Sequence, residues 1–173
     1  SLGLGGSDKK VIAGHEPCGV IVELGKNISK DMISLDTRVM QHHYRGCGNC
    51  CHCSTGWQQL CVEGVAEVYG VTGNGAHAKY MKCPANTLVK LRDDISFKSG
   101  AAISCGTGTA WGAIERLSLR ADQTIAIFGM GPVGLSAVML ASKMGATIIA
   151  IDINSKRLNR AKDFGADFLI NPN

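Results

Sequence analysis

Four closely spaced cysteines dictate the local fold of one segment of this chain. They follow the pattern C-x2-C-x2-C-x7-C and are Cys47, Cys50, Cys53 and Cys61. The first three lie on one tight loop, and Cys61 returns to complete a set of four soft ligands. Such a set, with no open position, is typical of structural zinc. The segment is too poor in apolar residues to bury these thiols without a metal, so we predict a structural zinc lobe over residues 46–62.

Composition limits the classes of protein to which the chain can belong. It has 173 residues, of which 45% are hydrophobic and 18% charged, as in a soluble globular protein. The net charge of +4 includes no basic tract, which argues against a nucleic-acid partner. No apolar run is long enough to span a membrane, and the first residues do not resemble a signal peptide. Eight cysteines at metal-binding spacing favour a reducing compartment, and we expect the cytoplasm.

The pattern of apolar residues divides the chain near residue 100. Residues 1–10 are expected to form a loop, and short strands are expected at 19–25, 38–40, 78–81 and 87–91. After residue 100 the pattern alternates between helix and strand. Helices are predicted at 101–117 (interrupted near 106–108), 135–144 and about 155–164, and strands at 124–128, 147–151 and 168–170. The first two of these later strands are continuously apolar, which predicts burial on both faces of a parallel sheet.

A glycine-rich turn after the strand at 124–128 predicts a dinucleotide site. Gly129, Gly131 and Gly134 form a G-x-G-x-x-G motif between a strand and a helix, and Asp152 ends the next strand. The glycines allow a tight turn, a close approach to pyrophosphate and close packing of helix on strand. A carboxylate at position 152 would accept hydrogen bonds from the adenosine ribose and repel a 2′-phosphate, which favours NAD over NADP. Glycines needed only for packing remain the alternative.

Four motifs in a fixed order resemble one enzyme family. They are Gly14-His15-Glu16, the four-cysteine loop, the stretch from Cys105 to Thr109-Ala110, and the glycine turn. Together they resemble the zinc-containing medium-chain alcohol dehydrogenases. The resemblance implies a β-rich GroES-like domain over residues 1–100, followed by the first half of an α/β Rossmann domain over residues 101–173.

The resemblance also assigns roles to individual residues. It implies that His15 and Cys105 bind a second, catalytic zinc, and that the neighbouring Glu16 approaches the metal during ligand exchange. Thr109 matches a position near the nicotinamide. The implied cofactor-binding residues are Thr109, Gly129, Gly131, Pro132, Val133, Gly134, Asp152 and Arg157.

The chain departs from the family pattern before His15. The family has another zinc-binding cysteine there, and this chain has none; we do not equate Ser7-Asp8 with that stretch. The implied catalytic site therefore lacks one protein ligand, and the implied Rossmann sheet is unfinished. We expect a fragment of a dehydrogenase that lacks both ends. An unfinished sheet exposes an edge, which predicts a homodimer.

Three functions are compatible with these features. The first is a zinc-dependent, NAD-linked alcohol dehydrogenase that acts on a small alcohol or carbonyl compound. The second is a zinc-stabilised fragment or binding module without catalysis. The third is a zinc-ribbon protein that binds nucleic acid, which leaves the glycine turn unexplained.

Overall fold

A computed structural model describes residues 10–29, 33–64 and 67–173. The chain forms two compact units, Ser1–Cys105 and Gly106–Asn173. The predicted loop at 1–10 and the Ser7-Asp8 stretch lie almost wholly outside the described residues. Within those residues, none of the helices has the length and apolar character needed to cross a membrane.

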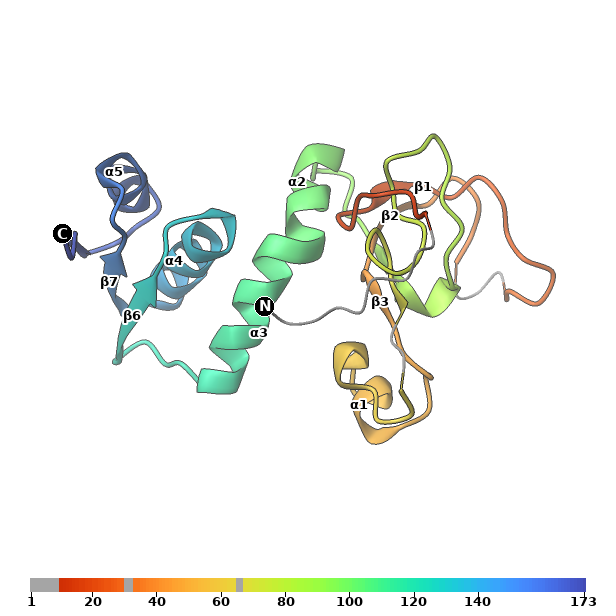
Figure 1. The fold of residues 1–173 in the computed structure, drawn as a ribbon, viewed down its shortest axis with the longest axis horizontal. Helices are drawn as coiled ribbons and strands as arrows, with labels where there is room; N and C mark the ends of the chain where they lie inside the picture. The colour runs from red at the N-terminus through yellow and green to blue at the C-terminus, as the bar shows by residue number, and fades with distance from the viewer. Residues whose placement is uncertain (1–9, 30–32, 65–66) are drawn as a thin grey trace. The chain divides into compact units, whose positions relative to one another are not determined.

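The first unit is built on a small antiparallel sheet (Figure 1). Strand β2 (Arg38–Gln41) lies between β1 (Cys18–Val20) and β5 (Leu88–Lys90), with Gly19 opposite Val39 and Met40 opposite Val89. A second pair joins β3 (Tyr44–Arg45) to β4 (Glu67–Val68). Two 3₁₀ turns, Gln58–Leu60 and Ala85–Thr87, lie in the connections.

A helical stretch follows the sheet and closes its core. Helix α2 (Phe97–Ala102) packs on β1 and β2, and it begins at Ser96, whose hydroxyl accepts a hydrogen bond from the backbone N–H of Ser99 (3.2 Å). Buried Leu91 packs against Gly100 of this helix. A π-helical turn (Ile103–Thr107) then leads into α3 (Gly108–Leu117). The predicted interruption of a helix at 106–108 therefore corresponds to this turn.

The strand predicted at 78–81 is wrong. The segment that pairs in this region is 75–77. The N–H groups of Gly75, Ala76 and His77 donate to the carbonyls of Ile12, Gly14 and Ala13 (2.7–2.9 Å). Residues 78–81 are irregular. Local β-propensity was overridden here because a strand forms only where a partner backbone is available.

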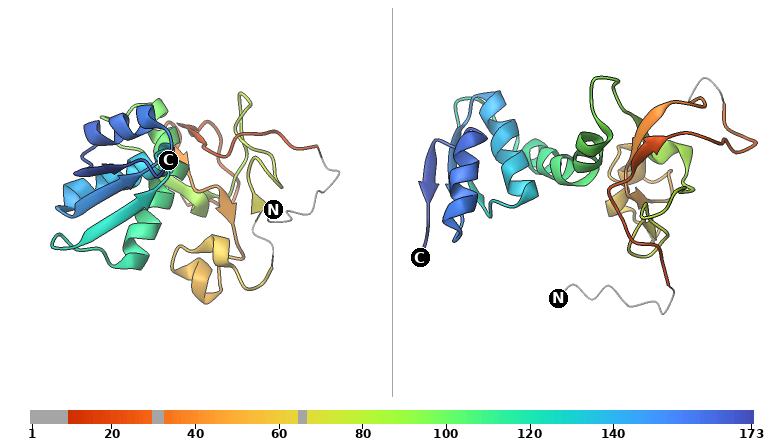
Figure 2. Two further views of the ribbon diagram at one scale, coloured as in Figure 1. Left: turned by 60° about the vertical axis from the view of Figure 1, so that its left-hand side comes forward. Right: turned by 90° about the horizontal axis from the view of Figure 1, so that it is seen from above.

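The second unit contains a parallel three-stranded sheet in the order β6-β7-β8. Its strands are β6 (Thr124–Phe128), β7 (Thr147–Ile151) and β8 (Phe168–Ile170). Helices α4 (Pro132–Met144) and α5 (Ser155–Asp163) connect them. Both helices lie beside the sheet (Figure 2). Their buried residues pack with the buried face of β7, where Ile148 and Ala150 are fully buried. The predicted alternation of strand and helix is thus present.

The prediction that these strands are buried on both faces is wrong for the described residues. Burial alternates along β6, and its last residue, Phe128, is 77% exposed. The reason is that α4 and α5 cover one face of the sheet, from which Ile148 and Ala150 project. The opposite face keeps the apolar residues that suggested full burial.

Candidate functional site

The four-cysteine segment forms a separate lobe of the first unit. Figure 1 and the left view of Figure 2 show it around α1 (Cys51–Ser54), projecting beyond β3. This short helix places Cys53 inward, and the 3₁₀ turn at Gln58–Leu60 leads to Cys61. The side-chain oxygen of Gln58 accepts a hydrogen bond from the N–H of Gly46 (3.0 Å), which closes the lobe. The cysteine spacing did not predict either helical turn.

The structure brings the four predicted ligands together. The sulfur atoms of Cys47, Cys50, Cys53 and Cys61 all lie within 4.8 Å of one another. Backbone N–H groups point at the Sγ atom of Cys47, from Asn49 (3.4 Å) and from Cys50 (3.3 Å). Cys51 is exposed and outside the cluster. Four sulfur donors at these separations fit a closed tetrahedral zinc site.

The surroundings of these thiols shift their pKa values in different directions. Backbone N–H groups of Cys53 and Val62 lower the pKa of Cys50 to about 6, because they stabilise its thiolate. Backbone hydrogen bonds from Cys47 and Glu63 likewise lower the pKa of Cys61. Desolvation raises the pKa of Cys53 to about 12. Backbone N–H groups thus point at all four sulfurs of the lobe, although at Cys53 desolvation outweighs the hydrogen bond from Gly48.

A second cluster joins His15, Glu16 and Cys105 within the first unit. Nε2 of His15 lies 3.2 Å from Sγ of Cys105, although 90 positions separate them in the sequence. One ligand atom from each of the three residues lies within 4.8 Å of the others. An imidazole nitrogen, a carboxylate and a thiolate are donors that suit a catalytic zinc. Within the described residues, the two clusters are the groups of at least three such donors that could hold a metal ion.

The backbone has an unusual local geometry at each of the two candidate metal-binding positions, His15 and Cys105. Gly14 has a φ of +97° and is held by the N–H of Ala76. A Cβ atom at Gly75 would overlap the carbonyl oxygen of Gly14, so this approach requires glycine. Cys105 lies in the π-helical turn, a local geometry that is frequent at functional sites.

Sequence reasoning missed a pair of histidines beside this cluster. His42 and His43 follow β2 directly, and the ring centroid of His43 lies 5.1 Å from that of His15. Burial, followed by the neighbouring His15 and His42, lowers the pKa of His43 to about 4. Burial also lowers the pKa of His42. Their only signal in the sequence was two adjacent histidines between a strand and the cysteine lobe.

In the second unit, the glycine turn joins β6 to α4. Gly129 has a φ of +89°, and Gly131 is the N-cap of α4, whose first residue is Pro132. A Cβ atom at Gly134 would overlap the carbonyl oxygen of Gly129, whereas one at Gly131 would meet no atom within 4 Å. The turn is therefore tight at Gly134 and open at Gly131, where a phosphate could approach the N–H groups of the helix.

Asp152 connects the end of β7 to the glycine turn. Its carboxylate oxygens accept hydrogen bonds from the N–H of Met130 (2.6 Å) and of Asn154 (2.8 Å). These bonds lower the pKa of Asp152 below its usual value. Each carboxylate oxygen retains a further acceptor position. The other predicted cofactor residues, Thr109, Pro132, Val133 and Arg157, have exposed side chains.

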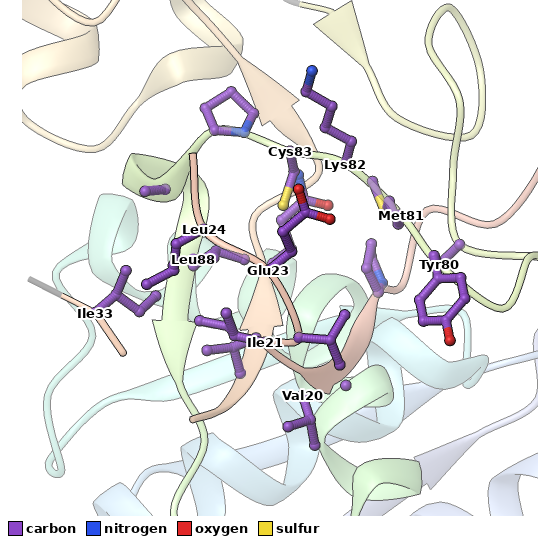
Figure 3. Close-up of a pocket in the computed structure, with 18 of the residues that line it drawn as sticks. Val20, Ile21, Glu23, Leu24, Ile33, Tyr80, Met81, Lys82, Cys83 and Leu88 are labelled. Atoms are coloured by element: carbon purple, nitrogen blue, oxygen red, sulfur yellow. The ribbon is translucent and has the colours of Figure 1, made fainter. Parts of the chain in front are cut away.

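A separate hollow in the first unit has a volume of about 990 Å³. Figure 3 shows Val20, Ile21 and Leu24 on one side of it, with the stretch from Tyr80 to Cys83 on the other. Neither metal-binding cluster contributes to its lining. This hollow is therefore not the candidate metal site, although Glu23, Lys82 and Cys83 are among its lining residues.

Two family models match the chain. Residues 4–93 match the alcohol dehydrogenase GroES-like domain, and residues 132–173 match the zinc-binding dehydrogenase domain. The first match alone covers more than half of the chain. The two matches also occur in the order of the two structural units.

Individual relatives agree with these matches. The chain is 39% identical over 155 residues to an uncharacterised zinc-type alcohol dehydrogenase-like protein, YphC, of Escherichia coli, covering 89% of this chain and 43% of the relative. Among solved structures, galactitol-1-phosphate dehydrogenase from Escherichia coli has a TM-score of 0.84 at 26% identity, covering 94% of this chain and 46% of that one. Acetophenone reductase from Geotrichum candidum, in complex with NAD, also has a TM-score of 0.84 at 26% identity, covering 93% and 47%. The chain spans about half the length of the curated relatives it matches.

Proposed function

The chain belongs to the zinc-containing medium-chain alcohol dehydrogenase family, and from that premise we propose that it acts in the NAD-linked oxidation of an alcohol or the reverse reduction of a carbonyl compound. The observation that carries the proposal is the approach of His15 Nε2 to Cys105 Sγ, at 3.2 Å, with Glu16 beside them. Residues so far apart in sequence have no local reason to meet.

Two zinc sites of different character fit the donors present. Cys47, Cys50, Cys53 and Cys61 form a closed set suited to a structural ion. His15 and Cys105 provide a nitrogen and a sulfur for a catalytic ion, and Glu16 adds an exposed carboxylate able to bind or withdraw. A catalytic zinc supplies a Lewis acid that lowers the pKa of an alcohol hydroxyl, so that hydride loss can occur near neutral pH.

The second unit is proposed to bind the NAD. The open N-terminus of α4 at Gly131 offers N–H groups to the pyrophosphate. Asp152 is held in place by two backbone N–H groups, and its remaining acceptor positions can receive ribose hydroxyls. Hydrogen bonding lowers its pKa, so it stays negative at neutral pH and disfavours the 2′-phosphate of NADP.

The assembly and the setting of the protein are also proposals. Strand β8 has three exposed residues and, among the described residues, pairs with β7 alone. Such an edge favours pairing with a second copy, and a homodimer is proposed. None of the eight cysteines, all of which lie in the described residues, forms a disulfide, which suits a reducing compartment such as the cytoplasm.

Two cysteine substitutions, one in the second cluster and one outside it, test this function. Cys105→Ser should remove one of two zinc ions per chain and most of the NAD-dependent turnover, because the serine hydroxyl is a poor zinc ligand. Cys51→Ser is the matched control, since Cys51 is exposed and outside both clusters; it should keep both zinc ions and the activity. Metal analysis and an assay with primary and secondary alcohols measure the two effects. If the native chain holds two zinc ions and oxidises no alcohol in the panel, the proposed activity is wrong and a binding module is favoured.

A further inference from the structure

His43 has a buried nitrogen atom that the fold leaves without a partner. Its side chain is only 7% exposed. Within the described part of the chain, its Nδ1 atom is buried and has no hydrogen-bond partner. Buried polar atoms in folded proteins are nearly always satisfied, and an exception requires an explanation such as a bound ligand or an ordered water.

The other ring nitrogen of His43 is already occupied. The backbone of Ser104 forms a hydrogen bond with His43 that favours the protonated ring, so the carbonyl of Ser104 is the acceptor. Because Nδ1 has no partner, this bond belongs to Nε2. The neutral ring therefore donates through Nε2 and has a free lone pair on Nδ1. Ser104 directly precedes Cys105, so this bond fixes the ring beside the metal-binding cluster.

The position of the ring favours a substrate contact over a role as a metal ligand. The ring of His43 meets that of His15 edge to face, with centroids 5.1 Å apart. His43 is not among the residues whose donor atoms all lie within 4.8 Å of one another. The ring of His43 is therefore in direct contact with His15, which is proposed to bind the zinc that holds the reacting hydroxyl group.

We propose that His43 is a substrate-binding residue, and that its Nδ1 atom accepts a hydrogen bond from a second hydroxyl group beside the one that is oxidised. This inference rests on the proposed function and narrows the substrate to alcohols that carry a vicinal hydroxyl or a similar donor. A substrate without that donor leaves the buried Nδ1 unpaired, and sites built to bind a hydroxyl reject such analogues strongly.

Two substitutions separate this role from a packing role. His43→Asn places an amide oxygen near the position of Nδ1 and loses the bond to Ser104. His43→Gln places an amide N–H near the position of Nε2 and loses the acceptor at Nδ1. If Nδ1 binds substrate, asparagine preserves the function and glutamine does not. If the histidine serves only to pack and to bond Ser104, the order is reversed.

The experiment compares 1,2-propanediol with 1-propanol in the zinc-loaded chain. In the native protein, kcat/KM should favour the diol by roughly tenfold or more, the value of about one hydrogen bond. His43→Gln should abolish this preference and His43→Asn should retain it. His52→Gln is the matched control and should also retain it, because His52 lies in α1 of the cysteine lobe and outside the cluster of His15, Glu16 and Cys105. An unchanged preference in His43→Gln overturns the proposal.

A binding measurement keeps the inference independent of turnover. With ¹⁵N-labelled histidine, 1,2-propanediol should shift the Nδ1 resonance of His43 in a saturable manner, and 1-propanol should not. A saturable shift without oxidation of either alcohol supports the role of His43 and contradicts the proposed activity. No shift with the diol overturns the role of His43, whether or not the alcohols are oxidised.

Discussion

Two glycines of the turn, Gly131 and Gly134, have different roles, and substitutions can distinguish these roles. Gly134 packs against the carbonyl oxygen of Gly129, and a Cβ atom there would overlap it. Gly131 has an extended backbone (φ −81°, ψ −170°) and open space around its missing Cβ atom. The fold therefore requires glycine at position 134, whereas glycine at position 131 is required only for the approach of the proposed pyrophosphate.

Gly134→Ala and Gly131→Ala should therefore fail in different ways. Gly134→Ala forces α4 away from β6 and should cost about 1–3 kcal/mol of folding stability, as overpacked cores do. Gly131→Ala should unfold like the native protein but bind NAD more weakly, because its methyl group occupies the space of the pyrophosphate. Thermal unfolding and NAD titration distinguish them. Equal loss of stability in both variants would contradict this division.

At the scale of elements, the cysteine lobe depends on a residue that is not a ligand. Gly46 precedes the first cysteine, and a Cβ atom there would overlap Sγ of Cys53. The N–H of Gly46 also donates to Gln58, which ties the two ends of the lobe. The lobe can close around four sulfurs only if this position lacks a side chain.

Gly46→Ala should consequently weaken the structural zinc site while all four cysteines remain. Displacement of Cys53 should cost about 1–3 kcal/mol and release zinc at a lower chelator concentration. Gly25→Ala is the matched control, since its Cβ atom would meet only Ile28 at an ordinary 3.8 Å. Zinc retention after dialysis against graded chelator measures the effect. The same retention in both variants would show that Cys53 moves without cost.

The sequence predicted most reliably what short-range spacing determines. The family and fold class are confirmed by the two family models, and the second unit has the expected alternation of strand and helix. The spacing of the cysteines, all within 15 positions of one another, predicted a cluster that the structure brings together. The pairing of His15 with Cys105 came from the resemblance alone, because residues 90 positions apart meet only through the tertiary fold.

The features that were missed depend on long-range contacts. His43 is significant only because the fold places it between His15 and Ser104. Residues 78–81 have the composition of a strand, but the partner backbone at 12–14 pairs with 75–77 instead. Neither outcome is encoded in the neighbouring residues, so no local pattern could reveal it.

At the scale of the whole molecule, the exposed strand β8 predicts self-association. Phe168, Leu169 and Ile170 are all exposed, and Phe168 is 57% accessible. An apolar strand with one unpaired edge is a template for a second copy. The native chain should therefore sediment as a dimer that dissociates on dilution.

Ile170→Lys tests whether this strand forms the interface. A charge on the strand makes association costly, because the ammonium group would lose its hydration in the interface. This variant should sediment as a monomer at concentrations where the native chain is dimeric. Leu117→Lys, on the exposed surface of α3, adds the same charge away from β8 and should remain dimeric. A native chain that is monomeric at every concentration would exclude the dimer, and a dimeric Ile170→Lys protein would place the interface elsewhere.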